Sequence, residues 1–183
     1  MKSCLLALVL LLGLNLAGQA QAQTIDPGLW ELKNDVRMPD RPEFAAQMAQ
    51  MREQMKNLPP EARKMMEQQM AGMGVALGGD GAIRRCVSPE EAKSDVIREG
   101  YTEDNCTYTQ VSRSGNVWRG TLVCTNPQSQ GEFMVTLHDS RHYTMEARMT
   151  GQDEGRPTRM EMTVDARFVS ADCGALAGKP ARR

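Results

Sequence analysis

The stretch RMEMTVDARFV, residues 159–169, alternates polar and apolar side chains from Arg159 to Phe168. A period of two predicts a β-strand with one buried face and one solvent-facing face. The polar parity carries charged residues and threonine. The apolar parity carries Met160, Met162, Val164, Ala166 and Phe168.

Other segments continue this pattern and build a sheet. Alternation recurs in residues 117–125, 132–138 and 143–150, more weakly in 107–112, and again in 27–38, and residues 82–87 are expected to add a short strand that ends at Cys86. Turn residues separate the consecutive segments, which predicts antiparallel neighbours. A one-faced sheet must close on itself or pack on another layer, so we expect a mainly β fold with about seven antiparallel strands in a meander curved into a barrel or half-barrel.

Residues 43–77 change character and predict a helical hairpin inserted after the first strand. Apolar side chains recur at intervals of three and four on both sides of a break at 57–60, which is a helical spacing. The hairpin therefore carries an apolar stripe, completed by Phe44, Leu58 and Leu77. We call its methionines the methionine seam: Met48, Met51, Met55, Met66, Met70 and Met73.

A shorter helix is predicted after residue 88. Ser88 precedes Pro89, which suits a first helical position, and Glu91 completes a capping box. We expect this helix to run to about Asp95, because the box fixes only its start.

The first 22 residues have the organisation of a signal peptide. Lys2 precedes the apolar stretch 5–16, and Ala20-Gln21-Ala22 fits a cleavage site. An uncleaved anchor is disfavoured because the apolar stretch is short for a membrane span. We therefore expect a periplasmic protein, secreted through a cleaved signal peptide, with no integral membrane span after processing.

Composition argues for one domain without a nucleic-acid partner. The chain has 183 residues, and 22 Lys and Arg balance 23 Asp and Glu. Such a balance lacks the basic footprint that binding to nucleic acid requires. We expect residues 23–174 to form a single β domain and residues 175–183 to be a disordered tail.

Four cysteines remain after processing: Cys86, Cys106, Cys124 and Cys173. An even number in an exported chain predicts two disulfides, for which three connectivities exist. We favour Cys86–Cys106, which would tie the capped helix to the sheet, and Cys124–Cys173. A four-cysteine zinc site is disfavoured because the chain contains no Cys-x-x-Cys motif.

The assembled pattern resembles the bacterial domain-of-unknown-function family 3617, a family of small exported envelope proteins. The resemblance covers nearly all of the mature chain. It implies a periplasmic location in a Gram-negative cell but no activity and no functional residues. The sequences that carry it are PGLWE at 27–31, the Met/Gln/Pro-rich segment 38–73, CVSPEEA at 86–92, CT at 106–107, RSGN at 113–116, Cys124 and DCG at 172–174.

No catalytic set is readable, so we expect a non-enzyme without a cofactor. The cysteines are assigned to disulfides, and no glycine-rich phosphate loop joins a strand to a helix. His138 and His142 flank a turn at 139–141 and share the polar parity. With Asp139 they are weak candidates for a metal site, and an exposed turn is the simpler interpretation.

The methionine seam has three interpretations. It packs the helices together or onto the sheet, it offers an adaptable apolar surface, or it binds Cu(I) through thioethers. Small residues on the inward parity, Gly120, Ala147 and Ala166, suggest room inside the sheet. We therefore expect a binding module for a hydrophobic small molecule or an envelope-protein segment, contacted by the seam and Trp118. The alternative is a periplasmic copper protein.

Overall fold

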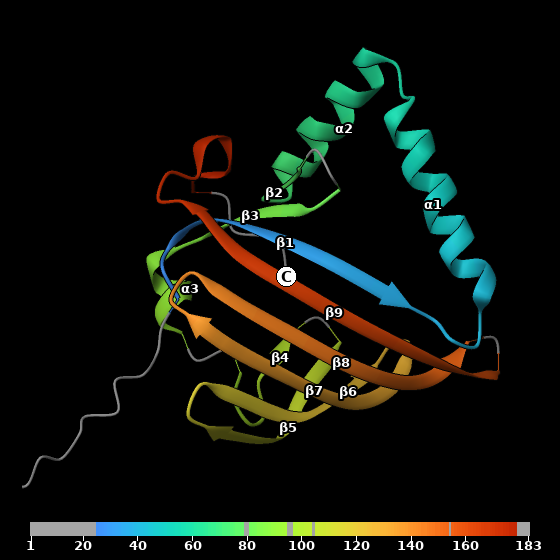
Figure 1. Cartoon of the computed structure of the whole chain (residues 1–183), viewed down its shortest axis with the longest axis vertical. Helices are drawn as coiled ribbons and strands as arrows, with labels where there is room; N and C mark the ends of the chain where they lie inside the picture. The colour runs from blue at the N-terminus through green and yellow to red at the C-terminus, as the bar shows by residue number, and fades with distance from the viewer. Residues whose placement is uncertain (1–24, 79–80, 95–96, 104, 154, 179–183) are drawn as a thin grey trace, which may run out of the picture.

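The computed structural model describes residues 25–78, 81–94, 97–103, 105–153 and 155–178. These residues form nine antiparallel strands in one sheet, in the order β2-β3-β1-β9-β8-β7-β6-β5-β4 (Figure 1). The strands are β1 (Gly28–Arg37), β2 (Val75–Leu77), β3 (Ile83–Val87), β4 (Thr102–Glu103), β5 (Cys106–Ser114), β6 (Val117–Thr125), β7 (Gln128–Asp139), β8 (His142–Asp153) and β9 (Arg156–Ser170).

The expected mainly β, antiparallel fold is confirmed, but the expected details need correction. The count of seven strands missed β2 and β4, which have three and two residues and are too short for alternation to reveal. The sheet is also not a barrel, because β2 and β4 remain at opposite edges without pairing. Strands β5 to β9 form the predicted meander, and β1 and β3 extend it on the other side.

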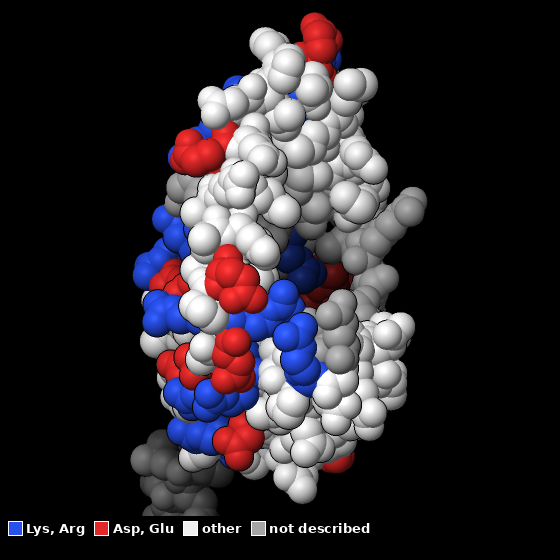
Figure 2. All heavy atoms as spheres, turned by 90° about the vertical axis from the view of Figure 1, so that its right-hand side faces the viewer, with Lys and Arg blue, Asp and Glu red and all other residues white. Residues whose placement is uncertain are grey.

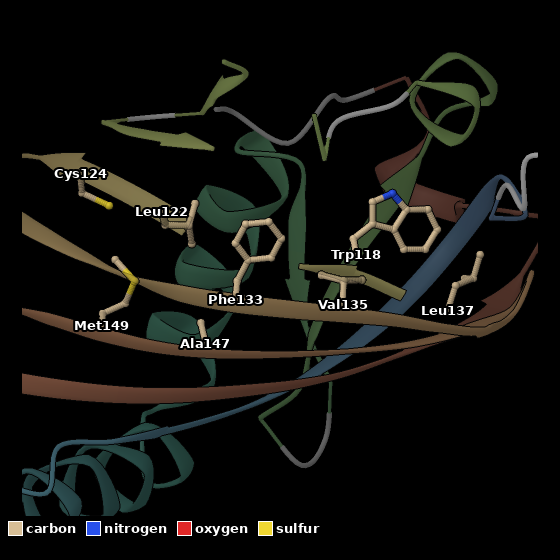
Figure 3. Packing of buried hydrophobic residues seen from close by; sticks show 8 residues of the cluster. All are labelled: Trp118, Leu122, Cys124, Phe133, Val135, Leu137, Ala147 and Met149. Atoms are coloured by element: carbon tan, nitrogen blue, oxygen red, sulfur yellow. The ribbon is translucent and has the colours of Figure 1, made fainter. Parts of the chain in front are cut away.

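The alternation correctly predicts the buried face. Side chains of the inward parity on β6, β7 and β8 project from one side of the sheet and form its larger core cluster (Figure 3). This cluster contains Trp118, Leu122, Cys124, Phe133, Val135, Leu137, Ala147 and Met149. A second cluster forms around Trp30 where β1 and β9 meet, with Val164 and Ala166 from β9.

Segments outside the strands close the buried face. Ile25 packs against both clusters, Ile97 joins the larger one, and Ala92 is buried in the smaller one. Ala92 belongs to α3 (Pro89–Lys93), whose predicted capping box is present: Glu91 N–H donates to Ser88 Oγ, and Ser88 N–H donates to the Glu91 carboxylate. The helix is shorter than expected, since Ser94 already has extended backbone.

The disulfide pairing expected from the sequence is wrong. The bonds join Cys106 to Cys124 and Cys86 to Cys173. Cys106 lies directly opposite Cys124 in the β5–β6 hairpin. This register depends on a β-bulge between Thr109 and Ser112, where Gln110 has a φ of 53°. Without the extra residue, regular pairing from the turn would place Cys106 opposite Thr125.

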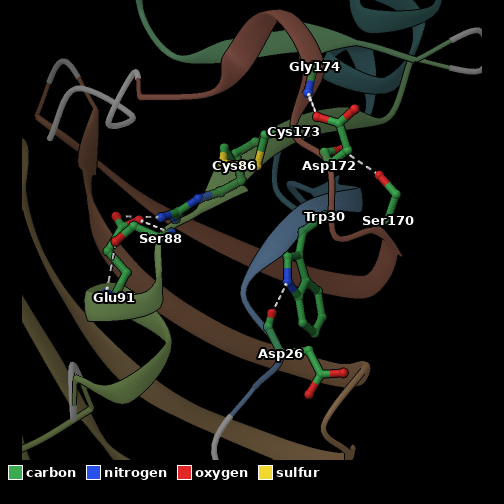
Figure 4. The surroundings of a disulfide bond; sticks show 10 residues. Asp26, Trp30, Cys86, Ser88, Glu91, Ser170, Asp172, Cys173 and Gly174 are labelled. Atoms are coloured by element: carbon green, nitrogen blue, oxygen red, sulfur yellow. Dashed lines mark hydrogen bonds and ion pairs between the residues drawn. A yellow bond between two sulfur atoms is a disulfide. The ribbon is translucent and has the colours of Figure 1, made fainter.

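The second disulfide joins β3 to the segment that follows β9, beside Trp30 (Figure 4). Cys86 lies on β3 opposite Leu29 of β1, and Leu29 in turn lies opposite Ser170 at the end of β9. Cys173 follows Ser170 by three residues and therefore reaches Cys86 across the end of β1. The two cysteines are 87 residues apart in sequence, so local sequence patterns could not predict that they are neighbours.

The helical insertion exists, with helices α1 (Pro42–Lys56) and α2 (Pro60–Gly72). It differs from the expected hairpin at its end. Met73 is the C-cap of α2, and Gly74 follows with a φ of 81°, so Leu77 belongs to β2 rather than to the helical stripe. In Figure 1, α1 and α2 rise away from the sheet as an arm rather than packing onto it along their length.

The chain ends of the domain are only partly described. The predicted signal peptide 1–22 lies outside the described residues, as does the tail at 179–183. The expected disordered tail at 175–183 starts too early, because Gly174–Leu176 form a 3-10 turn and Leu176 is buried. Across the described segments, no helix combines the length and the apolar character that a membrane crossing requires.

Replacing both members of each cysteine pair by serine should destabilise the protein according to the loop that each bond closes. The separations of 18 and 87 residues correspond to about 3 and about 4.5 kcal/mol in the loop-entropy model. Urea unfolding of the two double variants measures both values. Peptide mapping without reduction provides the control, and a Cys86–Cys106 fragment would contradict the structure.

Removing the arm should leave the sheet intact. A Gly/Ser linker in place of residues 42–73 keeps β1 and β2, and no residue of α1 or α2 is buried. The shortened protein should therefore unfold cooperatively, with a loss of no more than about 2 kcal/mol. Circular dichroism during urea titration measures this, and loss of the cooperative transition would show that the arm belongs to the core.

Candidate functional site

The arm, which we define as residues 42–73, carries most of the exposed large apolar side chains of the described residues. Its helices meet at residues 57–59 and diverge toward the sheet, where α2 continues into β2 (Figure 1). Neither helix contains a buried residue. Amphipathic helices usually bury their apolar stripe in a core, so this arrangement is unusual for a structural element.

Six large hydrophobic side chains are exposed in the described residues, and four of them belong to the arm. The exposed fractions are 37% for Met48, 53% for Met51, 65% for Met65 and 41% for Met73, against 40% for Val123 and 47% for Val169. The remaining seam residues Met55, Met66 and Met70 are half-buried.

The methionine seam contains both half-buried and exposed side chains. Half-buried Met55 and Leu58 lie at the junction of α1 and α2, but half-buried Met66 and Met70 lie on α2 no nearer to it in sequence than exposed Met51 does on α1. Sequence spacing missed Met65, the most exposed of these side chains, because it falls beside the stripe rather than on it. Its apolar character at an exposed helix position was the available signal.

Polar contacts stabilise the junction between α1 and α2 and the point where the chain enters α1. Arg63 Nη2 on α2 donates to the carbonyl oxygen of Lys56 at 2.9 Å, which links the two helices. At the base, Arg159 of β9 binds the Asp40 carboxylate through Nη2 at 2.7 Å and Nε at 3.1 Å. These hydrogen bonds lower the pKa of Asp40 below its usual value.

The arm carries no net charge. Helices α1 and α2 contain four acidic residues and four basic ones, namely Glu43, Glu53, Glu61, Glu67, Arg52, Lys56, Arg63 and Lys64. Figure 2 shows one face of the molecule. Charged side chains of both signs gather in its lower part, over the sheet, and the arm in its upper part shows mainly uncharged atoms. The arm therefore attracts neither an anionic nor a cationic partner by charge.

Trp118, which the sequence assigned to the binding surface, lies in the core instead of with the seam. Its side chain is 9% exposed, and the Arg113 guanidinium stacks over the ring at 4.3 Å. The room expected beside Gly120 is filled, because a Cβ there would meet the Phe133 ring at 2.8 Å. Ala147 and Ala166 are buried as well. The interior is packed by its own side chains at these positions.

The two histidines do come together, as their shared parity predicted. Their rings stack with centroids 4.4 Å apart. Their nitrogens have other partners, since His138 Nε2 lies 3.0 Å from Thr144 Oγ1 and His142 Nε2 lies 3.3 Å from Asp165 Oδ2. Asp139 accepts a hydrogen bond from Arg141 N–H. Within the described parts, no three His, Cys, Asp or Glu side chains cluster with metal-binding geometry.

Known sequences agree with the resemblance seen in the motifs. The model of a family described as "Protein of unknown function (DUF3617)" matches residues 25–173. The chain is also similar to a protein from Pseudomonas putida described as "Uncharacterized protein in lpd-3 5'region". The two are 38% identical over 145 residues, which cover 79% of this chain and 98% of the relative.

No solved structure matches the chain significantly. The family match spans the whole sheet, both disulfides and the arm. The chain therefore belongs to the DUF3617 family of proteins of unknown function.

Proposed function

We propose that this chain is a non-catalytic periplasmic binding protein whose methionine seam, together with Met65, accepts a hydrophobic small molecule or an apolar segment of a partner protein. The observation that carries the proposal is the concentration of exposed large hydrophobic side chains on an arm that buries none of its residues. Two disulfides support the oxidising compartment.

The packed interior supports a binding surface on the arm rather than one inside the sheet. Phe133 fills the space beside Gly120, and Trp118 is buried. A ligand inside the sheet would have to displace these side chains and would disrupt the packing of a close-packed core. A ligand on the arm displaces only water from methionines that are already exposed.

The chemistry of methionine suits such a surface. Its unbranched side chain has three rotatable bonds and adapts to ligands of different shape. Covering apolar area contributes about 25 cal/mol per Å². The balanced charges of the arm favour a neutral apolar ligand over an ionic one. The Arg63 contact holds the two helices together at their junction, so the surface is partly organised before binding.

Cu(I) is the second candidate ligand, because thioether sulfurs are soft donors. Met66 and Met70 lie one helical turn apart on α2, and Met73 follows at its end. Three thioethers at this spacing can converge on one ion. The same side chains also suit an apolar surface, so the two functions have to be separated by experiment.

Introducing charge on the arm should abolish apolar binding. The double variant Met51→Glu/Met73→Glu places two carboxylates among the exposed methionines, and desolvating them disfavours an apolar ligand. We expect the affinity for the fluorescent probe N-phenyl-1-naphthylamine to fall by at least about tenfold, as expected for one poorly compensated polar group. Fluorescence titration of the mature protein measures it.

The matched control is Val123→Glu/Val169→Glu, which changes two comparably exposed apolar residues of the sheet. It should bind the probe as the wild type does. Equal loss of binding in both double variants would contradict the assignment to the arm, as would a wild type that binds no probe.

Replacing Met48, Met51, Met66 and Met70 by leucine should separate the two ligands. Leucine keeps the apolar area and costs little stability, less than about 1.5 kcal/mol at each position, but it has no sulfur lone pair. Probe binding should survive while any Cu(I) binding, followed by competition with a chromogenic Cu(I) chelator, should be lost. Loss of probe binding would contradict an apolar binding surface at these positions. Retained Cu(I) binding would show that these four thioethers are not the ligands of the ion.

A further inference from the structure

A hollow lies on the polar face of the sheet, on the side away from the core clusters. It occupies about 390 Å³ over strands β5 to β8. Gly120, Met134 and Ala147 are among its lining residues, together with two arginines and two glutamates, namely Arg119, Glu132, Glu146 and Arg148. The alternation placed all four on the polar parity, but no sequence pattern indicates that they surround a hollow.

These four charges are unpaired although opposite charges lie next to them. Glu132 and Arg148 are directly opposite each other on β7 and β8. Within the described residues, none of the four forms an ion pair or a side-chain hydrogen bond, while elsewhere on this sheet Arg84 pairs with Glu31 at 2.7 Å and Arg167 with Asp165 at 2.8 Å. Two positive and two negative groups are therefore left for a ligand.

The strand register sets the spacing of the charges. Arg119 of β6 lies opposite Met134 of β7, and Met134 lies opposite Glu146 of β8. Two inter-strand spacings separate the backbones of Arg119 and Glu146 by about 10 Å. The half-buried side chain of Met134 lies between them. The row thus offers a cation, an apolar contact and an anion in a line.

We propose that this hollow binds a short free peptide of about three residues, because an extended residue spans about 3.3 Å. The peptide carboxylate pairs with Arg119, its terminal ammonium pairs with Glu146, and its central side chain contacts Met134. In the next row, Glu132 supplies an acceptor and Arg148 supplies donors for the peptide amide and carbonyl groups. Thr121, which donates to Gln110 Oε1 at 3.3 Å, also lines the hollow.

The test follows the methyl signal of Met134 by NMR while trialanine is added to the mature protein carrying ¹³C-methyl methionine. We expect a saturable shift at about millimolar peptide. Trialanine with an acetylated N-terminus and an amidated C-terminus should bind at least about tenfold more weakly, because it lacks both charges. The signals of Met51 and Met65 on the arm should not move.

Neutral variants test the assigned partners. Arg119→Gln and Glu146→Gln should each weaken binding by at least about threefold, which is typical of an exposed ion pair. Lys93→Gln and Glu90→Gln, which remove the same charges from the exposed surface of α3, should bind like the wild type. No shift at Met134, equal binding of the blocked peptide, or tighter binding of phosphoethanolamine, whose charges are closer together, would each overturn the proposal.

Discussion

The burial of Trp30 is the interaction on which the rest of the structure depends. Its side chain is completely enclosed, and its indole N–H donates to the Asp26 carbonyl oxygen at 2.8 Å. Trp30 pairs with β3 and β9 through its backbone, and its ring contacts Tyr143 of β8 and Phe168 of β9. One residue thus joins the meander to the strands added outside it, and the Cys86–Cys173 bond lies beside it (Figure 4).

Local patterns predicted the strands of this sheet because each strand has one wet face. β6 begins and ends at the predicted residues, and the inward parities of β7, β8 and β9 match the buried side chains. The capping box of α3 was equally local and equally reliable. Very short strands such as β4 have no such pattern and owe their pairing to β5 alone.

Long-range relations could not be predicted from the same patterns. The Cys106–Cys124 bond requires the one-residue bulge at Gln110, which also explains why the alternation in β5 was weak: Tyr108 and Val111 both pack on the core despite opposite parity. The methionine seam has the spacing of a packed helix pair. Only the structure reveals that α1 and α2 diverge, so that a predicted packing stripe becomes an exposed surface.

The central claim is that the sheet completes its core without the arm and leaves the methionine seam free to bind. Native-state hydrogen exchange tests it most directly by comparing amides of α1 and α2 with those of β1, β8 and β9. The account predicts that the arm opens locally, with a free energy several kcal/mol below that of global unfolding. Arm amides that exchange only through global unfolding, with the same free energy as the amides around Trp30, would contradict it.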